Sequence, residues 1–288
     1  MLDTCDALER DGFSVTRLPV DSGGIVDPQQ LSAAITDRTL LVSVMAANSE
    51  VGTLQPLAEI ARICGERNVL LHSDAAQAVG KLPFTVDGLD LVSFCAHKLY
   101  GPKGIGALYV RGRRPRIRLE PLLHGGGHER GRRSGTLPVP LIVGFAKAVD
   151  LGLEDLAEEA LRQAALRDRL WAGLQAGAGE VRLNGDPERR LPGSLSVCFP
   201  GLEADALMSA LKDVALSSGS ACASASGEPS HVLRAIGLSE RDARASLRFG
   251  LGRGTTADEI GRVVSRVCEE AMALRARGPA AVGRLRGP

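Results

Sequence analysis

Short apolar runs alternate with stretches of helical periodicity through the first half of the chain. The run Leu-Leu-Val-Ser-Val-Met at 40–45 is almost continuously apolar, which predicts a strand buried on both faces. Three further apolar runs predict strands at 69–74, 89–94 and 105–110. Because helical patterns lie between the first strands, we expect βα units and a mainly parallel sheet. Polar residues collect at the carboxyl ends of these runs, which is where open parallel sheets bind ligands.

Two helix starts are visible in the same region. Asp27 precedes Pro28, so its carboxylate can cap the first turn while the proline occupies the first helical position. Pro56 opens a second helix, whose apolar positions 57, 60, 61 and 64 share one face. Cys64 is therefore predicted to be a core residue.

The second half of the chain is predicted to form a smaller domain. A long helix over 141–175 is expected to join the two parts, and residues 194–199 alternate as a strand does. Thr256 and Glu259 form a capping box before a helix whose apolar face includes Cys268. We expect a large domain over 1–156, a small domain over 157–275 and a flexible tail over 276–288, which is rich in Gly, Pro and Arg.

Composition narrows the class of protein. Of 288 residues, 44% are apolar and 24% charged, which excludes disorder over the whole chain. The net charge of +1 gives no general attraction to nucleic acid, so direct DNA binding is not expected. No apolar run approaches the ~20 residues that span a bilayer, and the acidic first residues are unlike a signal peptide. We therefore expect a cytoplasmic protein without a membrane partner.

The six cysteines form no CxxC pair and no Cys/His cluster with zinc-binding spacing, so neither a metal site nor a disulfide framework is expected. Cys222 differs from the other five, because it lies among small residues in SSGSACASASG at 217–227, without apolar periodicity. That composition suits a loop that carries an exposed, reactive thiol, although a structural cysteine in a loop remains the alternative.

An aspartate and a lysine follow two neighbouring predicted strands. Asp74 lies in HSDAAQ at 72–77 and Lys98 in AHK at 96–98, so the two side chains can meet across a crevice. A lysine in such a place can form a Schiff base with an aldehyde cofactor. Pyridoxal 5′-phosphate needs that lysine and also a carboxylate on its ring nitrogen. The alternative is a surface lysine and an aspartate that caps a helix.

Two further groups of residues favour an anionic ligand. Glycines, hydroxyls and guanidinium groups are mixed in 124–136, which suits either a phosphate or a flexible basic loop. Arg248 alternates with Leu247 and Phe249, so its side chain is expected on the face opposite the apolar one. There its guanidinium can bind a carboxylate ligand or form a structural ion pair. Five arginines between 111 and 118 indicate a solvated edge, or a docking patch for an acidic partner or tRNA.

These motifs together resemble those of the cysteine desulfurases of the NifS/IscS type, in the class V aminotransferase family. Four segments carry the resemblance in order: HSDAAQAVGK, AHKLYGPKGIGALYV, HGGGHERGRRSGT, and SSGSACASA followed by EPSHVLRAIG. It extends from about Leu2 to about Arg253. The resemblance implies a fold-type I pyridoxal-phosphate transferase, an α/β fold whose mainly parallel sheet is flanked by helices, with a smaller C-terminal α+β domain.

The resemblance also implies which residues bind the cofactor. Lys98 corresponds to the lysine that holds pyridoxal 5′-phosphate, Asp74 to the partner of the ring nitrogen, and Gln77 to the donor to the ring hydroxyl. The remaining cofactor positions that it implies are Ser49, Cys95, His97 and Thr136. Thr136 corresponds to a phosphate ligand donated by the second subunit of a homodimer.

For the substrate, L-cysteine, the resemblance implies a carboxylate clamp at Arg248 and a contact at Asn48. Cys222 corresponds to the nucleophile that takes the sulfur, becomes a persulfide and releases L-alanine. The sulfur acceptor is expected to be an Fe–S scaffold protein or a protein of tRNA thiolation.

The chain departs from the family pattern at three places. Members carry a long segment before the position of Leu2, with a phosphate-binding loop and a histidine that stacks on the cofactor, and we expect this chain to lack both. Ser49 stands where asparagine is common, and Cys95 where serine is usual, although a thiol is a weak donor. Two alternatives stay open: a selenocysteine lyase, or a catalytically impaired remnant that only binds partners or dimerises.

Overall fold

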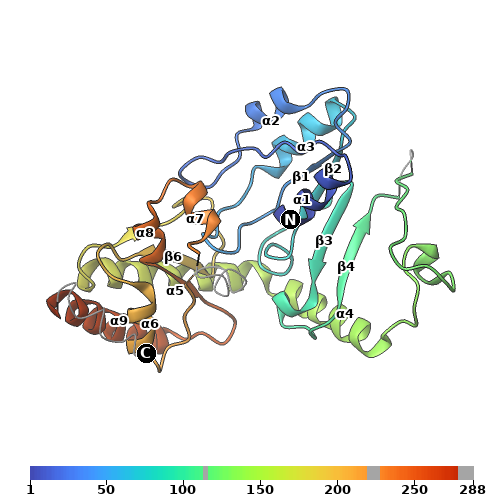
Figure 1. Ribbon diagram of the computed structural model, residues 1–288. Coiled ribbons are helices and arrows are strands. Elements are labelled where there is room, and N and C mark those ends of the chain that lie inside the picture. The colour runs from blue at the N-terminus through green and yellow to red at the C-terminus, as the bar shows by residue number, and fades with distance from the viewer. Residues whose placement is uncertain (113–115, 219–227, 278–288) are drawn as a thin grey trace, which may run out of the picture.

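The computed structural model describes residues 1–112, 116–218 and 228–277. In this part of the chain two sheets form, one in each half of the sequence, with helices packed against both (Figure 1). The first sheet consists, in spatial order, of β1 (Leu41–Ser43), β2 (Leu70–Asp74), β3 (Leu91–Cys95) and β4 (Gly106–Val110). The strands β1, β2 and β3 are parallel and β4 is antiparallel to β3, so the prediction of a mainly parallel sheet is confirmed.

Helices cover one face of this sheet. Leu31 from α2 (Pro28–Ala34) and Ile60 from α3 (Leu57–Glu66) belong to the same buried cluster as Leu71 of β2 and Val92 of β3. By contrast, α1 (Leu2–Arg10) has no buried residue. None of the helices in the described ranges has the length and apolar character that crossing a bilayer requires.

Both predicted helix starts in this region are confirmed. The Asp27 carboxylate accepts a hydrogen bond from the Gln29 N–H at 2.8 Å, and Pro28 is the first residue of α2. Pro56 precedes α3, and Cys64 on the inner side of this helix is 1% exposed. Burial raises the pKa of the Cys64 thiol to about 11, so the thiol stays protonated in the core.

The strand predicted at 40–45 is shorter and more exposed than expected. Val42 is buried, but Leu41 is 45% exposed and β1 has 3 residues. The prediction that this strand is buried on both faces is wrong. Because β1 is the edge strand of the described sheet and the helices cover one face only, its alternate side chains stay open to solvent.

The single helix predicted over 141–175 is also wrong. The structure has two helices there, α4 (Val139–Glu154) and α5 (Leu156–Gly177). They are separated at Asp155, whose φ of −121° and ψ of 30° are not helical. The buried side of α4 contacts the segment after β3, whereas that of α5 contacts the second sheet, and the break allows each helix to face its own core.

The second sheet is antiparallel and lies in the C-terminal half. Its strands are β5 (Arg182–Leu183), β6 (Ser194–Cys198) and β7 (Ser246–Gly250). Three short helices and one long helix accompany it: α6 (Ala204–Ala210), α7 (His231–Ala235), α8 (Glu240–Arg244) and α9 (Ala257–Arg277). Together these elements form the predicted smaller α+β part of the fold.

One face of the second sheet packs against α5 and α9. Leu247 and Phe249 of β7 are 1% and 3% exposed in this core, and Arg248 lies on the opposite face, as the alternation predicts. At the start of α9 the predicted capping box is confirmed. The Glu259 N–H donates to Thr256 Oγ1 at 3.2 Å, and the Thr256 N–H donates to Glu259 Oε2 at 2.8 Å.

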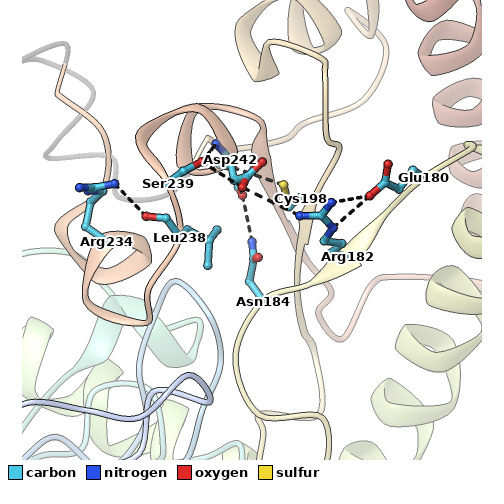
Figure 2. Close-up of polar contacts among 9 residues, drawn as sticks. Glu180, Arg182, Asn184, Cys198, Arg234, Leu238, Ser239 and Asp242 are labelled. Atoms are coloured by element: carbon cyan, nitrogen blue, oxygen red, sulfur yellow. Dashed lines mark hydrogen bonds and ion pairs between the residues drawn. The ribbon is translucent and has the colours of Figure 1, made fainter.

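A buried polar network occupies the other side of β6 (Figure 2). Asn184 Nδ2 donates to Ser246 Oγ at 3.0 Å, and this hydroxyl donates to the Asp242 carbonyl at 2.8 Å. Cys198 Sγ donates to the same carbonyl at 3.4 Å. Burial raises the pKa of the Cys198 thiol to about 11. Cys198 is therefore a protonated structural thiol.

The two sheet regions are joined by hydrogen-bonded loops. The Leu191 N–H donates to the Gly52 carbonyl at 2.8 Å, and the buried Arg190 donates to the Val51 carbonyl at 3.2 Å. Gly185, at a φ of +81°, allows this close approach, since a Cβ there would lie 3.0 Å from the Val51 carbonyl oxygen. These contacts fix the relative position of the segments that line the cleft described next.

Candidate functional site

A cleft of about 290 Å³ lies where the two sheet regions meet. Its wall includes five of the residues predicted from the sequence: Ser49, Gln77, His97, Lys98 and Arg248. They come from the turn after β1, the segment after β2, the segment after β3 and the strand β7. The folded chain therefore gathers residues that lie up to 199 positions apart in the sequence.

Lys98 is presented by a short 3-10 helix, η1 (Ala96–Leu99), directly after β3. Ala96 and Leu99 are 0% and 4% exposed and anchor this turn against α4. Lys98 itself is exposed toward the cleft, and among the described residues it has no hydrogen bond or ion pair. Its amine is therefore available to a ligand.

Gln77 lies on helical turns that follow β2. The Val79 N–H donates to the Ala75 carbonyl at 3.0 Å, and the Lys81 N–H donates to the Ala78 carbonyl at 3.0 Å. This winding brings Lys81 beside Gln77, and Lys81 Nζ donates to Gln77 Oε1 at 2.6 Å. The carboxamide oxygen of Gln77 is thus occupied, and its NH₂ group remains for a ligand.

The charged side chains on the described wall of the cleft are cations. Lys81, Lys98 and Arg248 line it, and no Asp or Glu is found among the described residues of its wall. Burial lowers the pKa of Lys81 to about 8, and the positive charges of Lys98 and Arg248 act in the same direction. Such a site favours an anion, for example a phosphate or a carboxylate.

Arg248 connects three segments at one end of the cleft. One guanidinium nitrogen donates to the Ser49 carbonyl at 2.8 Å, and the other donates to Ser217 Oγ at 3.4 Å. The Arg248 N–H also donates to the Ser217 carbonyl at 2.7 Å. These contacts hold the guanidinium at the cleft wall while several of its five N–H donors remain for a ligand.

Cys222 lies outside the described residues, but the residues that flank its segment are placed. Ser217 contacts Arg248 on one side, as above. On the other side Ser230 caps α7 by accepting from the Val232 N–H at 3.1 Å, and its hydroxyl donates to the buried Glu50 carboxylate at 2.5 Å. Both described ends of the segment are thus tied to residues beside Ser49.

Asp74 and Cys95 end neighbouring strands but do not line the cleft itself. The exposed Asp74 carboxylate accepts from the Ala76 N–H at 2.9 Å. Cys95 Sγ lies 3.7 Å from Nε2 of His97, so these two side chains are adjacent. Beside Asp74 on the same strand, His72 contacts hydroxyls of β1 and β3 at 2.8 Å and 3.1 Å, and burial lowers its pKa.

Two other predicted residues are placed differently from the cleft group. Asn48 is buried, and its side-chain oxygen accepts from the N–H groups of Glu50 and Val51 at 2.8 Å and 3.0 Å. It therefore shapes the turn that presents Ser49. Thr136 is exposed and lies in the long connection between β4 and α4, where a separate hollow of about 120 Å³ is lined by residues of 121–134.

Of the arginines between 111 and 118, Arg113 and Arg114 lie outside the described residues. Arg111 is partly buried and pairs with Asp90 at 2.5 Å, so it stabilises the end of β4. Arg116 and Arg118 are exposed.

The sequence-based prediction did not include Lys81, Tyr100 and Gln163, which also line the cleft. A signal for Lys81 was present, because it follows Gln77 by four positions within the motif HSDAAQAVGK, the spacing of neighbours on a helical turn. Gln163 gave no such signal, since it belongs to α5, far away in sequence from the other cleft residues.

Comparison with known proteins identifies the family and the relatives of this chain. Residues 2–263 match the family Aminotransferase class-V. The cysteine desulfurase IscS of Anaeromyxobacter sp. (strain Fw109-5) is 55% identical over 281 residues, which cover 97% of this chain and 69% of that protein. The corresponding protein of Rickettsia prowazekii (strain Madrid E) is 50% identical over 97% of this chain and 68% of its own length.

Solved structures of related proteins share the fold of this chain. A NifS-like protein superimposes with a TM-score of 0.85 at 38% identity, covering 93% of this chain and 71% of the other. The structure of DndA from Streptomyces lividans gives a TM-score of 0.74 at 38% identity, over 86% of this chain and 71% of that one. The fold and the cleft thus define a fold-type I pyridoxal-phosphate enzyme.

Within that class, the chain belongs to the aminotransferase class-V family, and its curated relatives include cysteine desulfurases. The donor set of the cleft fits the family's cofactor, pyridoxal 5′-phosphate. In the part of the chain that the structure describes, a lysine amine without a partner suits its aldehyde, a carboxamide NH₂ suits its ring oxygen, and a wall of cations without acids suits its phosphate.

Proposed function

We propose that this chain is a cysteine desulfurase that converts L-cysteine to L-alanine and transfers the sulfur to Cys222 as a persulfide. The observation that carries the proposal is the Lys98 amine, which no described residue pairs, in a cleft whose described wall holds no acid and also presents Arg248. The class of enzyme follows from the family, whereas the residue roles below are proposals.

The cofactor, when bound, supplies an electron sink for the bond changes at the substrate. Lys98 Nζ would hold it and, once displaced by the substrate amine, accept the α-proton and later return a proton to the product. Asp74 would face the ring nitrogen, because an anionic carboxylate keeps that nitrogen protonated. Gln77 would donate its NH₂ to the ring oxygen, and the adjacent Cys95 and His97 would face the phosphate.

Arg248 would bind the substrate carboxylate. The Ser49 carbonyl, 2.8 Å from one guanidinium nitrogen, fixes the plane of the group, and the remaining N–H donors match the two carboxylate oxygens. Asn48 contributes by holding the turn that positions Ser49. The substrate α-carbon would then lie between Arg248 and Lys98, which share the cleft wall.

Cys222 would take the sulfur. Its thiolate forms an S–S bond with the substrate sulfur while the C–S bond breaks, and the electron pair of that bond stays with the carbon, which a proton then completes as alanine. The thiols of Cys64, Cys198 and Cys268 have raised pKa values through burial, so they are poor nucleophiles. The contact of Ser217, five positions before Cys222, with the proposed substrate clamp Arg248 supports this assignment.

The location, the oligomeric state and the sulfur acceptor are proposed from the family resemblance. The chain would act in the cytoplasm as a homodimer, in which Thr136 of one subunit contacts the cofactor phosphate of the other. Thr136 is exposed and is not among the described residues that line the cleft of its own chain, which supports this assignment. The persulfide would pass to an Fe–S scaffold protein or to a protein of tRNA thiolation.

The test uses the purified full chain with pyridoxal 5′-phosphate and L-cysteine. We expect a yellow protein that releases alanine and carries a persulfide detectable by mass spectrometry. Lys98→Ala should lose the bound colour, and Cys222→Ser should keep it while losing the persulfide. A chain that binds no cofactor and forms no alanine would refute the proposal and favour a binding remnant. Alanine formation from selenocysteine but not from cysteine would instead identify a selenocysteine lyase.

A further inference from the structure

The cleft contains a lysine that the mechanism above does not use. Lys81 is partly buried beside Gln77, and its ammonium group has no acidic partner among the described residues. A buried cation without a counter-ion costs free energy, so its presence needs an explanation from the geometry. Within the described residues, its Nζ donates a hydrogen bond of 2.6 Å to Gln77 Oε1.

We propose that Lys81 is a positioning residue, whose ammonium group fixes the Gln77 carboxamide so that only the amide NH₂ faces the bound ligand. The inference deepens the proposed function, on which it rests, because Gln77 is the proposed donor to the ring oxygen of pyridoxal 5′-phosphate.

Hydrogen-bond chemistry determines which end of the Gln77 carboxamide faces Lys81. A carboxamide has two nearly isosteric ends, one that donates and one that accepts. A protonated lysine only donates, so the end of Gln77 that faces Lys81 must be the oxygen. The other end is then a donor, which is the polarity that a ligand oxygen bearing negative charge requires.

The local fold makes this pair rigid. On the turns that carry it, Ala75 and Ala78 are 0% and 2% exposed and belong to the core of the first sheet. Gly80, at a φ of +71°, packs against Leu99 of η1, the turn that also presents Lys98. Gln77 and Lys81 are thus held at a constant spacing on a turn that is packed against the lysine-bearing helix.

A simpler role must be distinguished from positioning. Lys81 also adds positive charge to the cleft, and this charge by itself would favour an anionic ligand. The two roles differ in how they depend on Gln77. A pure charge effect is the same whether or not residue 77 carries a carboxamide, whereas positioning requires it.

A double-mutant cycle on the 288-residue chain separates the positioning role from the charge effect. The affinity for pyridoxal 5′-phosphate is measured by visible absorbance and by equilibrium dialysis for the unaltered chain, Lys81→Met, Gln77→Ala and the double variant. We expect Lys81→Met to weaken binding about tenfold, equal to the loss of one hydrogen bond. In the Gln77→Ala background the same substitution should change the affinity by less than about twofold.

Two further variants control for folding and for surface charge. Lys81→Arg keeps a donor-only cation and should restore most of the affinity, whereas Lys212→Met removes an exposed lysine outside the cleft wall and should change nothing. Equal losses from Lys81→Met in both backgrounds would overturn positioning while leaving the proposed function intact. Failure of the unaltered chain to bind the cofactor would overturn both.

Discussion

The guanidinium of Arg248 offers a quantitative test of the proposed substrate clamp. It donates one hydrogen bond to the Ser49 carbonyl at 2.8 Å and another to Ser217 Oγ at 3.4 Å, and its remaining N–H groups can bind a carboxylate. Arg248→Ala removes a pair of charge-assisted bonds to the substrate, each worth at least ~1.5 kcal/mol. The sum of about 3 kcal/mol corresponds to a loss of about 100-fold in kcat/KM for L-cysteine.

Arg248→Lys separates charge from geometry. Lysine keeps the charge but cannot bind Ser49 and a carboxylate in one plane, so we expect a loss of about tenfold, mainly as a higher KM. The assay is alanine release at saturating cofactor over a series of cysteine concentrations. Arg244→Lys on α8, outside the cleft wall, is the matched control and should behave as the unaltered chain. A KM for Arg248→Lys equal to that of the control would refute the carboxylate clamp.

Three further predictions concern stability, pH dependence and thiol chemistry. Leu207 is 0% exposed in the core of the second sheet, so Leu207→Ala should lower the free energy of unfolding by about 2–5 kcal/mol. Urea unfolding measures this change, and an unchanged free energy of unfolding would contradict the prediction. Because the pKa of Lys81 is about 8, its ammonium loses its proton as pH rises through that value, and cofactor affinity should fall above about pH 8 in the unaltered chain but stay level in Lys81→Arg. The ionisable groups that influence Lys81 there are Lys98, Arg248 and Cys95. The Cys198 thiol, with its pKa raised to about 11, should react with iodoacetamide at pH 8 far more slowly in the folded protein than after denaturation, and equal rates would contradict its buried position.

Local features of the fold could be predicted from the sequence because their interactions span only a few residues. The cap of α2 by Asp27 and the capping box of α9 involve groups two or three positions apart, and both are present as expected. The alternation in β7 likewise fixed the side of the sheet on which Arg248 lies. Cys64 is in the core because the helical period places it on the apolar face of α3.

Burial and helix continuity could not be predicted in the same way. An apolar run such as 40–45 indicates a strand but does not tell whether a neighbour covers each face, and β1 lies at the described edge of its sheet. The helical pattern over 141–175 is continuous in the sequence, but the helix itself breaks at Asp155, because α4 and α5 pack on different sheets. Both errors concern contacts with distant segments, which local periodicity does not encode.

The sequence by itself determined the candidate chemistry: a lysine and an aspartate after neighbouring strands, a cysteine among small residues, and an arginine off the apolar face of a strand. Only the tertiary structure placed Arg248 against the Ser49 carbonyl, 199 positions away, and left the Lys98 amine without a described partner, in a cleft that no described acid lines. It also brought Lys81 Nζ within hydrogen-bond distance of Gln77 Oε1. The physical reason is that strand order and loop packing set the distances between groups far apart in sequence, and the charge and hydrogen-bonding state of each group depends on those distances.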